Sequence, residues 1–508
     1  MKLSQLINGV DIIKLSADAK ADVSTLCYAA DKCEQDSMFV AICGLAHDGH
    51  DFIADAVNRG ARFIVCEKDV QIPTWVAVIK VQSSRRALGV IAKNYFGDPS
   101  AGVCLVGVTG TNGKTTTTYI LESILKQAGF KCGVLGTVNY RYNNKIFPAP
   151  NTTPESFEMQ KILRAMADDG ITHVIVEVSS HAIALKRVDD CDFDLGVFTN
   201  LTHEHLDYHL TMENYFQAKK RFFAEVLPQS KKDSRQKMII NGDDKWGQII
   251  LKDVALPALT YGVGEKNAIH AGDYELSLSG IRANIDLAGE IISISTPLVG
   301  KFNIYNILAA AAAAKALRID SSIIKAGIEN LPYVPGRLER IDSALGFTVL
   351  IDYAHKPDAL KQVLQNLSEF KKKRILTVFG CGGNRDKGKR PLMGAAATFY
   401  SDMTIVTSDN PRLEDPLAII AEIEKGIESN KIKKVDSDHL SEYSEAHCYT
   451  VIPDRRTAIE TAIMAAQAED IVLIAGKGHE DYQILGTKKI SFDDRIVAST
   501  ALDLRSKK

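Results

Sequence analysis

The chain has 508 residues, enough for about three domains of ordinary size, and its 45% hydrophobic and 24% charged residues are ordinary for a globular enzyme. A formal net charge of −2 gives no broad basic surface for nucleic acid, and nine cysteines without a CxxC pair predict reduced thiols in a cytoplasm rather than a zinc site or a disulfide scaffold. The N-terminus lacks the apolar core of a signal peptide, and the long apolar run at 307–317 is too short to cross a bilayer. We therefore expect a cytoplasmic protein without membrane insertion.

The first predicted domain covers residues 1–102. Short apolar runs at 38–42 and 61–66 alternate with helical stretches, which predicts an α/β fold. The sequence Asp98-Pro99-Ser100-Ala101-Gly102 that follows is typical of a linker.

The second predicted domain, 103–335, opens on an apolar strand followed by Gly110-Thr111-Asn112-Gly113-Lys114-Thr115 and a helical stretch at 117–127. A glycine-rich turn between a strand and a helix is typical of a phosphate-binding loop, because backbone N–H groups and the helix N-terminus attract an anion. Lys114 would reach the terminal phosphates and the Thr115 hydroxyl would hold Mg²⁺. The usual spacing places a further glycine where this chain has Val108. A glycine stands one place earlier, at Gly107, so the loop is a variant.

Strands that are apolar throughout, at 173–178 and 195–199, favour a parallel sheet covered on both faces in this domain. A boundary follows at 333–336. The third predicted domain, 336–508, repeats the α/β pattern with strands at 348–351, 375–380, 403–406 and 470–474. Open α/β sheets bind ligands at the carboxyl ends of their strands, where this chain has polar or glycine-rich residues.

Two further segments of the second domain carry candidate chemistry. Glu177 ends a buried strand, where a carboxylate could bind Mg²⁺ or could instead cap a helix. The loop at 199–209 has three histidines and two acids, but its spacing is not that of an HExxH zinc helix, so the pattern alone leaves an ambiguous surface loop. From the pattern alone, 218–223 is a helix with a solvated basic face.

Together these motifs resemble those of the Mur ligases, the ATP-dependent amino-acid-adding enzymes of peptidoglycan precursor synthesis. The resemblance runs from about residue 22 to 497, with several independent motifs in the family's order. The matching segments are 109–116, 151–154, 177–181, the histidine loop through Lys219, 300–306, 335–339, 352–358 and 454–455.

Within that family the chain is similar to the members that add the third residue of the stem peptide. The pointers are the segments 48–52, 380–386, 407–412 and 476–480. Asp409-Asn410-Pro411-Arg412 is the family's mark of enzymes that add meso-2,6-diaminopimelate, whereas lysine-adding members usually lack the arginine. The resemblance implies an ATP-dependent amide-bond-forming ligase that adds this amino acid to UDP-N-acetylmuramoyl-L-alanyl-D-glutamate through an acyl phosphate.

The fold that the resemblance implies is α/β in three domains, and we expect a monomer. An N-terminal domain would bind the UDP end of the acceptor, a central parallel-sheet domain with the phosphate loop would bind ATP, and a C-terminal Rossmann-like domain would bind the incoming amino acid.

The resemblance further implies a nucleotide and metal site. ATP would be held by Gly110, Thr111, Asn112, Gly113, Lys114, Thr115 and Thr116, with Asn303, Arg337 and Asp352 closing over it. One Mg²⁺ would be held by Thr115 and Glu177, and a second by Glu177, His205 and a carbamylated Lys219. The catalytic residues would be Lys114, Glu177, His205 and Lys219. A carbamate turns the lysine cation into a carboxylate ligand, which replaces repulsion of the metals with attraction.

Two substrate sites are implied in the same way. The UDP-linked dipeptide would be bound by Thr152, Thr153, Ser179 and Arg187. The incoming amino acid would be bound by Arg385, Asp409, Asn410, Pro411, Arg412, Gly476 and Glu480.

Three positions depart from the family's motifs. Ala29-Ala30-Asp31 stands where an Asp-Ser-Arg motif contacts the uridine side, so the usual serine is missing. Glu204 and Asn384 each replace an aspartate, while the neighbouring His205 and Arg385 are kept.

Three other functions are weighed against this one. A lysine-adding Mur ligase would share nearly every motif. A folylpolyglutamate-synthase-like ligase would lack the first domain, although this chain has about 100 residues before its phosphate loop. A nucleotide-dependent switch would not require a carbamate at Lys219 beside Glu177 and His205.

Overall fold

The computed structural model describes residues 1–507 except 17, 45–46, 233–235, 438–439 and 441–446. The side chains of Leu206 and Asp207 also lie outside the described part, so the second acid of the histidine loop is not placed. The chain forms two compact units. The first comprises Met1–Gly272, Ile285–Ile292 and Tyr305–Ile328, and the second Asp273–Asn284, Ser293–Ile304 and Glu329–Lys508.

A five-stranded sheet, in the order β1-β5-β4-β3-β2, forms the N-terminal part of the first unit. β2 to β5 pair in parallel, and β1 runs antiparallel to β5. The apolar runs predicted at 38–42 and 61–66 are β3 and β4, and apolar clusters pack on both faces of the sheet. The elements are α1 (Leu3–Leu6), β1 (Ile12–Leu15), β2 (Leu26–Cys27), η1 (Ala30–Lys32), β3 (Ser37–Val40), η2 (Gly49–Phe52), α2 (Ile53–Asn58), β4 (Ala61–Cys66), β5 (Ala77–Val81) and α3 (Ser84–Tyr95).

The chain then builds an eleven-stranded sheet in the order β16-β15-β14-β13-β12-β11-β6-β10-β7-β8-β9. Its central strands pair in parallel, as the apolar runs predicted. β8 and β9 extend the sheet antiparallel from β7, which the sequence did not indicate because they are three residues long and half-exposed or exposed apart from Tyr140 and Tyr142. The strands are β6 (Cys104–Thr109), β7 (Cys132–Leu135), β8 (Tyr140–Tyr142), β9 (Lys145–Phe147), β10 (His173–Glu177), β11 (Leu195–Phe198), β12 (Lys237–Asn241), β13 (Ala258–Gly262), β14 (Ile269–Ser277), β15 (Gly280–Leu287) and β16 (Ile291–Thr296).

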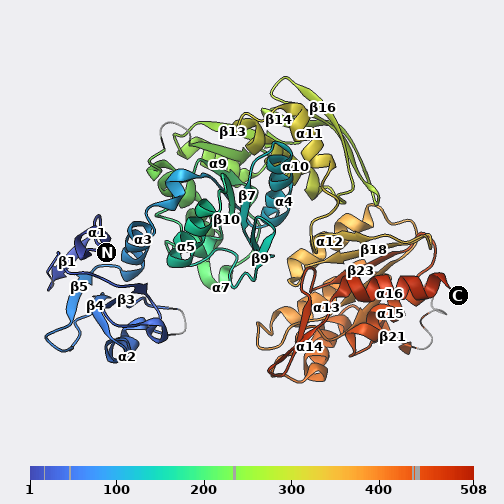
Figure 1. Cartoon of the computed structure of the whole chain (residues 1–508). Coiled ribbons are helices and arrows are strands. Elements are labelled where there is room, and N and C mark those ends of the chain that lie inside the picture. Colours follow the sequence, from blue (N-terminus) through green and yellow to red (C-terminus); the bar gives the residue numbers. More distant parts are fainter. Residues whose placement is uncertain (17, 45–46, 233–235, 438–439, 441–446, 508) are drawn as a thin grey trace. The chain divides into compact units, whose positions relative to one another are not determined.

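Helices and short turns flank these strands, and α4 packs on β7 and β10 (Figure 1). The alanine-rich run becomes α10, whose residues 307–314 are almost fully buried, as expected for a close-packed helix. The elements are η3 (Pro99–Gly102), α4 (Lys114–Gln127), α5 (Ser156–Asp168), α6 (Ser180–Ala184), α7 (Leu206–His209), α8 (Met212–Arg221), a π-helical turn η4 (Phe222–Val226), η5 (Leu227–Gln229), α9 (Lys245–Asp253), α10 (Phe302–Ala316) and α11 (Ser321–Glu329).

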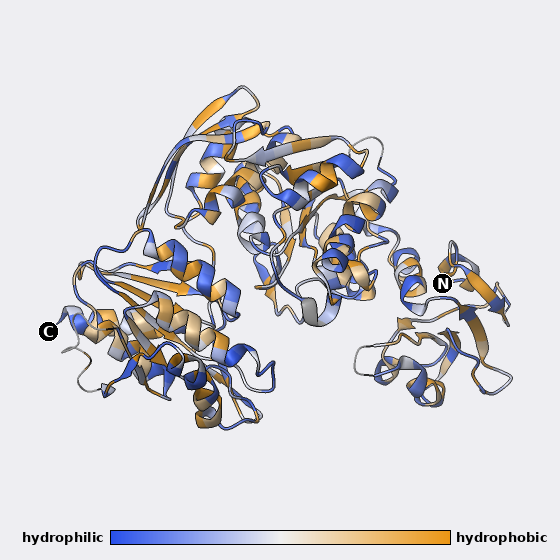
Figure 2. Ribbon diagram, turned by 180° about the vertical axis from the view of Figure 1, so that it is seen from behind, coloured by the Kyte–Doolittle hydropathy of each residue, from blue (hydrophilic) through white to orange (hydrophobic). Residues whose placement is uncertain are grey.

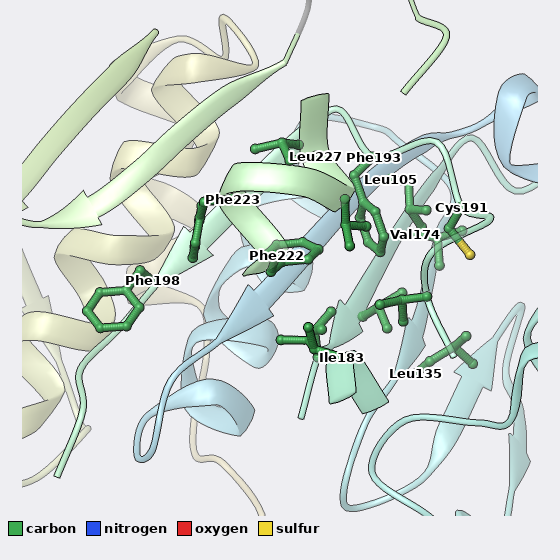
Figure 3. Packing of buried hydrophobic residues seen from close by; sticks show 14 of the residues in the cluster. Leu105, Leu135, Val174, Ile183, Cys191, Phe193, Phe198, Phe222, Phe223 and Leu227 are labelled. Carbon is green, nitrogen blue, oxygen red and sulfur yellow. The ribbon is translucent and has the colours of Figure 1, made fainter. Parts of the chain in front are cut away.

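Two paired glycines provide the surface on which the π-helical turn packs. Gly107 on β6 faces Gly196 on β11 in the register of the two strands. A Cβ at Gly107 would lie 2.5 Å from Phe222 Cζ, and one at Gly196 would lie 3.0 Å from both Phe222 and Phe223. Figure 3 shows these two rings with Phe193 and Leu227 in the core. The displaced glycine of the variant motif therefore lies inside the strand and makes room for Phe222, while the loop keeps Gly110 and Gly113.

The second unit contains a seven-stranded sheet in the order β17-β18-β23-β19-β20-β22-β21, parallel except for the β17–β18 pair. Figure 2 shows hydrophobic colour along the inner strands and hydrophilic colour on the outer helix faces. The elements are β17 (Glu339–Ile341), β18 (Thr348–Asp352), α12 (Pro357–Ser368), β19 (Ile375–Phe379), α13 (Lys389–Tyr400), β20 (Met403–Val406), α14 (Pro416–Glu428), β21 (Lys433–Lys434), β22 (Cys448–Val451), α15 (Arg455–Ala465), β23 (Ile471–Ala475), the hairpin β24 (Tyr482–Leu485) and β25 (Lys488–Ser491), and α16 (Asp494–Ser506). No helix of the described residues is long and apolar enough to span a membrane.

Candidate active site

The glycine-rich loop between β6 and α4 has the conformation that an anion cradle requires. Gly110 and Gly113 have φ angles of 148° and 86°, a region that favours glycine. A Cβ at Gly110 would lie 1.8 Å from Thr199 Oγ1, so the loop closes tightly against the end of β11. Lys114 Nζ folds back and donates to the carbonyl oxygens of Gly110 (2.9 Å) and Thr111 (2.8 Å). The glycine-rich turn is therefore formed between strand and helix, with Lys114 directed over it, and its role as a phosphate loop stays a prediction.

Glu177 lies beside this loop, at the end of β10, and is 1% exposed. Its carboxylate accepts from Thr115 Oγ1 (3.2 Å), from Thr137 Oγ1 (2.8 Å) and from the Thr137 backbone N–H (3.0 Å). No basic side chain among the described residues pairs with it, so the buried carboxyl group is met by the hydroxyls and the N–H group alone. A carboxylate and a hydroxyl are ligands that Mg²⁺ prefers, and the predicted pair of Thr115 and Glu177 therefore fits this ion.

Lys219 is buried at 1% exposure on α8, whereas the pattern alone predicted a solvated lysine. Its Nζ donates to the Gly110 carbonyl oxygen at 2.9 Å and lies 4.8 Å from the centre of the Tyr215 ring. Burial, together with the nearby Lys114 ammonium, holds the pKa of Lys219 well below its usual value. The solvated interpretation is therefore wrong for this residue, because the helix turns it toward the phosphate loop.

The histidine loop packs as a cluster of rings. His209 Nε2 lies 2.9 Å from Ser180 Oγ, and the His209 ring stacks on Tyr215 with 5.0 Å between centroids. The His205 ring lies 5.0 Å from that of His181. Among the described residues, no three His, Cys, Asp or Glu side chains gather closely enough to hold a metal. The structure thus joins Thr115 to Glu177, and it places the His205 ring beside those of His181 and Tyr215.

The four residues predicted to bind the acceptor come together at the end of β10. Thr153 Oγ1 donates to the Glu177 carbonyl (2.7 Å) and lies 3.2 Å from Ser179 Oγ, and Arg187 Nη1 donates to the Thr153 carbonyl (3.2 Å). Thr152 Oγ1 lies 3.1 Å from Thr137 Oγ1, which in turn bonds Glu177. Sequence reasoning missed Thr137. Thr137 could have been identified from the sequence by its position just after the parallel strand β7.

In the second unit, Arg412 lies against the glycine turn after β19. Its Nη1 donates to the carbonyl oxygens of Gly383 (2.8 Å) and Asn410 (3.4 Å). A Cβ at Gly382 would lie 2.9 Å from Arg412 Nη1 and 3.9 Å from Arg385 Cγ, so the two predicted arginines flank this glycine. No described carboxylate forms an ion pair with Arg412.

An ion pair with Glu414 or Asp415, both close in sequence, would give Arg412 a purely structural role. Glu414 is instead engaged by both terminal nitrogens of Arg390, at 2.9 and 3.0 Å. Asp415 caps α14 by accepting from the Leu417 N–H. The arginine is therefore available for a carboxylate from outside the chain.

Asn410 and Glu480 are joined by a lysine that sequence reasoning did not assign. Lys477 is fully buried, and its Nζ donates to Asn410 Oδ1 (3.2 Å) and Glu480 Oε2 (3.1 Å). Asn410 Nδ2 donates to the same Glu480 oxygen at 2.9 Å. Gly476 has a φ of 114°, and a Cβ there would lie 2.8 Å from Asp409 Oδ2. The available signal for Lys477 was its position inside the Gly-Lys-Gly-His-Glu motif.

The residues predicted to close over ATP lie in the second unit. Asp352 accepts from the Leu338 and Ala354 N–H groups, both at 2.8 Å, and burial raises its pKa although Arg337 opposes this. The Arg337 guanidinium lies 5.0 Å from the centre of the Tyr353 ring. Asn303 Nδ2 donates to the Val299 carbonyl at 2.7 Å. Arg337 and Asp352 are thus neighbours, and the Asn303 amide bonds a carbonyl four residues earlier in the chain.

Comparisons with known proteins cover nearly the whole chain. Family models match residues 22–96 (Mur ligase family, catalytic domain), 108–314 (Mur ligase middle domain) and 336–478 (Mur ligase, glutamate ligase domain). The UDP-N-acetylmuramoyl-L-alanyl-D-glutamate–2,6-diaminopimelate ligase of Geobacter sulfurreducens is 45% identical over 99% of this chain and 98% of its own length. The ligase of the same name from Geobacillus thermodenitrificans is 41% identical over 99% of this chain and all of its own.

Solved structures agree in fold. A structure titled as the same 2,6-diaminopimelate ligase superposes with a TM-score of 0.70 at 30% identity, covering 100% of this chain and 99% of its own. A folylpolyglutamate synthase from Mycobacterium tuberculosis reaches a TM-score of 0.59 at 17% identity, covering 77% of this chain and 92% of its own.

Proposed function

This chain belongs to the Mur ligase family, and from that membership we propose that it is a ligase of the diaminopimelate-adding (MurE) type. It joins 2,6-diaminopimelate to UDP-N-acetylmuramoyl-L-alanyl-D-glutamate, and ATP provides the driving force. Relatives at 38–45% identity over essentially the full chain carry this name. The observation that carries the choice of amino acid is Arg412, which is placed beside the Asn410–Glu480–Lys477 network without a carboxylate partner among the described residues.

ATP binding is assigned to the glycine-rich loop. The N-terminus of α4 would attract the phosphates, and Lys114 would move from the loop carbonyls to a phosphate oxygen. Thr115 and Glu177 would hold Mg²⁺, which neutralises charge on the phosphates when bound. Lys219, once carbamylated, would add a second carboxylate near the loop, with His205 supporting it. Asn303, Arg337 and Asp352 are proposed to contribute to the same nucleotide.

The acceptor is assigned to Thr152, Thr153, Ser179 and Arg187, which present hydroxyls and a guanidinium close to Glu177. The D-glutamyl carboxylate attacks the γ-phosphorus of ATP, the bond to the bridging oxygen breaks, and ADP leaves. The amine of diaminopimelate then attacks the carbonyl of the acyl phosphate. The amine loses a proton, phosphate leaves, and an amide forms. Lys114 offsets the charge on the transferring phosphoryl group.

The incoming amino acid is assigned to the second unit. Arg412 would bind the far carboxylate with two parallel hydrogen bonds, and Arg385 flanks the same turn. Glu480 and Asn410 would bind the neighbouring ammonium, and Lys477 fixes their orientation. Lysine lacks the far carboxylate and would leave Arg412 desolvated without a partner.

The test is product mass spectrometry with diaminopimelate and lysine offered together, alongside phosphate release. We expect the diaminopimelate adduct, and phosphate release that requires both acceptor and amino acid. A lysine adduct would assign the lysine-adding type. Adduct formation on a folate, or ATP cleavage without any adduct, would contradict the proposal. Lys114→Ala, which should reduce turnover by orders of magnitude, controls for contaminating ATPases.

A further inference from the structure

Two cysteines of the N-terminal sheet have side chains in direct contact. Cys27 ends β2 and Cys33 follows the 3₁₀ turn η1, and their Sγ atoms lie 2.8 Å apart. Both are largely buried, at 5% and 9% exposure. A disulfide bond is about 2.05 Å long, so a small movement of either side chain would close it. Both thiols are free in the structure.

The two thiols differ in a way that suits stepwise oxidation. The hydrogen bond from Cys27 lowers the pKa of Cys33, whereas that bond and burial raise the pKa of Cys27. Cys33, at 9% exposure against 5% for Cys27, is the slightly more accessible of the two. A thiolate on the accessible side is the form that attacks an external disulfide.

We propose that Cys27 and Cys33 are a reversible disulfide site that opens and closes with the thiol redox state of the medium. The oxidant is a low-molecular-weight disulfide. The Cys33 thiolate attacks one of its sulfurs and releases one small thiolate. The Cys27 thiolate then attacks the Cys33 sulfur and releases the second. One disulfide is thereby reduced to two thiols as the protein pair gives up two electrons and two protons.

The bond would change the loop between the two cysteines. In the reduced protein the Cys33 thiol donates to the Ala29 carbonyl over 3.8 Å, and a disulfide sulfur has no hydrogen to donate. Ala29-Ala30-Asp31 stands where the family's uridine-side motif lies, so closing the bond should weaken binding of a uridine diphosphate. This consequence rests on the proposed function, whereas the bond itself does not.

The cross-link can be identified by peptide mapping of the full-length protein. Trypsin cuts after Lys20, Lys32 and Arg59, so Cys27 and Cys33 fall in separate peptides, 21–32 and 33–59. After treatment with oxidised glutathione and alkylation of remaining thiols, we expect the two peptides to run as one species that reduction separates. Cys43 shares the second peptide, so Cys43→Ser must keep the link and Cys33→Ser must lose it. A link that needs Cys43, or only mixed disulfides with glutathione, would overturn the proposal.

The consequence for ligand binding is measured by calorimetry with UDP. We expect a Kd several-fold higher in the oxidised protein, restored by a dithiol and unaffected by oxidant in Cys33→Ser. An equal Kd in both states would show that the disulfide does not affect uridine binding, and the proposal of the disulfide itself would still stand on the peptide map. No UDP binding in either state would count against the proposed function instead.

Discussion

Lys219 and Lys220 are adjacent on α8 and meet opposite surroundings. Lys220 is half-buried and pairs with Asp253 at 2.6 Å, while Lys219 is buried against a carbonyl oxygen of the phosphate loop. Carbon dioxide reacts with the neutral amine, and a lowered pKa keeps the Lys219 amine neutral at a lower pH than that of an exposed lysine. The carbamate proposed for this helix is therefore predicted at Lys219.

Lys219→Ala should lose at least about a hundredfold in turnover, because the proposed carbamate, an anionic ligand for the metals, can no longer form. Formate or acetate should restore part of the activity by occupying the vacated space. Lys220→Ala is the matched control and should keep its activity. ¹³C NMR with labelled bicarbonate should show a carbamate signal in the parent and in Lys220→Ala only; full activity of Lys219→Ala would exclude a role for the carbamate.

Arg412→Ala should reduce the preference for diaminopimelate over lysine by about 2 kcal/mol, roughly 30-fold, because a charge-assisted contact to the far carboxylate is lost. The measurement is kcat/KM for both amino acids. Lys387→Ala removes an exposed cation in the same region, 3.6 Å from Glu414, and should leave the ratio unchanged. If Arg412→Ala stays active with an unaltered ratio, the arginine has a structural role only.

At the scale of elements, the positions of the buried strands could be predicted from the sequence, whereas the π-helical turn and the burial of Lys219 could not. The runs at 61–66 and 403–406 form β4 and β20 over those same residues, because strands covered on both faces are apolar over most of their length. Arg62 is the exposed exception in β4, and Thr404 is a buried polar residue in β20. The π-helical turn after α8 has no such signal, since it depends on the fit of Phe222 to two glycines on other strands. The burial of Lys219 could not be predicted either. Helix periodicity tells which residues share a face of α8, but not that the glycine-rich loop packs against the face with Lys219.

Gly107→Ala tests the packing beneath that turn. The new methyl group would overlap Phe222 and Phe193, and overpacking of this kind costs about 1–3 kcal/mol of the free energy of unfolding. Gly102→Ala adds the same methyl group where nothing lies within 4 Å and is the matched control. Denaturant unfolding should show the loss only in Gly107→Ala, and Phe222→Leu should recover part of it in the double variant. Additive effects of the two changes would mean that the residues are not coupled.

At the scale of the whole molecule, the chain consists of two compact units, so unfolding need not be one transition. The second unit contains a fully buried ion pair in which Arg455 on α15 donates to both oxygens of Asp494 on α16, at 2.8 and 2.6 Å. Removing one member of such a pair leaves a buried charge uncompensated.

Arg455→Met should therefore destabilise the second unit by about 3–5 kcal/mol and leave the first unchanged. Differential scanning calorimetry should show one transition moving to lower temperature while the other stays in place. Lys372→Ala breaks an exposed pair with Glu469 in the same unit and should change stability by less than about 1 kcal/mol. A joint shift of the whole profile would show that the two units unfold as one.

The carbonyl oxygen of Gly110 accepts hydrogen bonds from both Lys114 and Lys219. A carbamate on Lys219 would end that sharing, because an anion is repelled by the carbonyl oxygen and attracts the Lys114 ammonium. Uptake of one molecule of carbon dioxide would then change the charge balance of the phosphate loop before any nucleotide arrives. The supply of inorganic carbon, and not only that of ATP, would set how much of the ligase is ready to build cell wall.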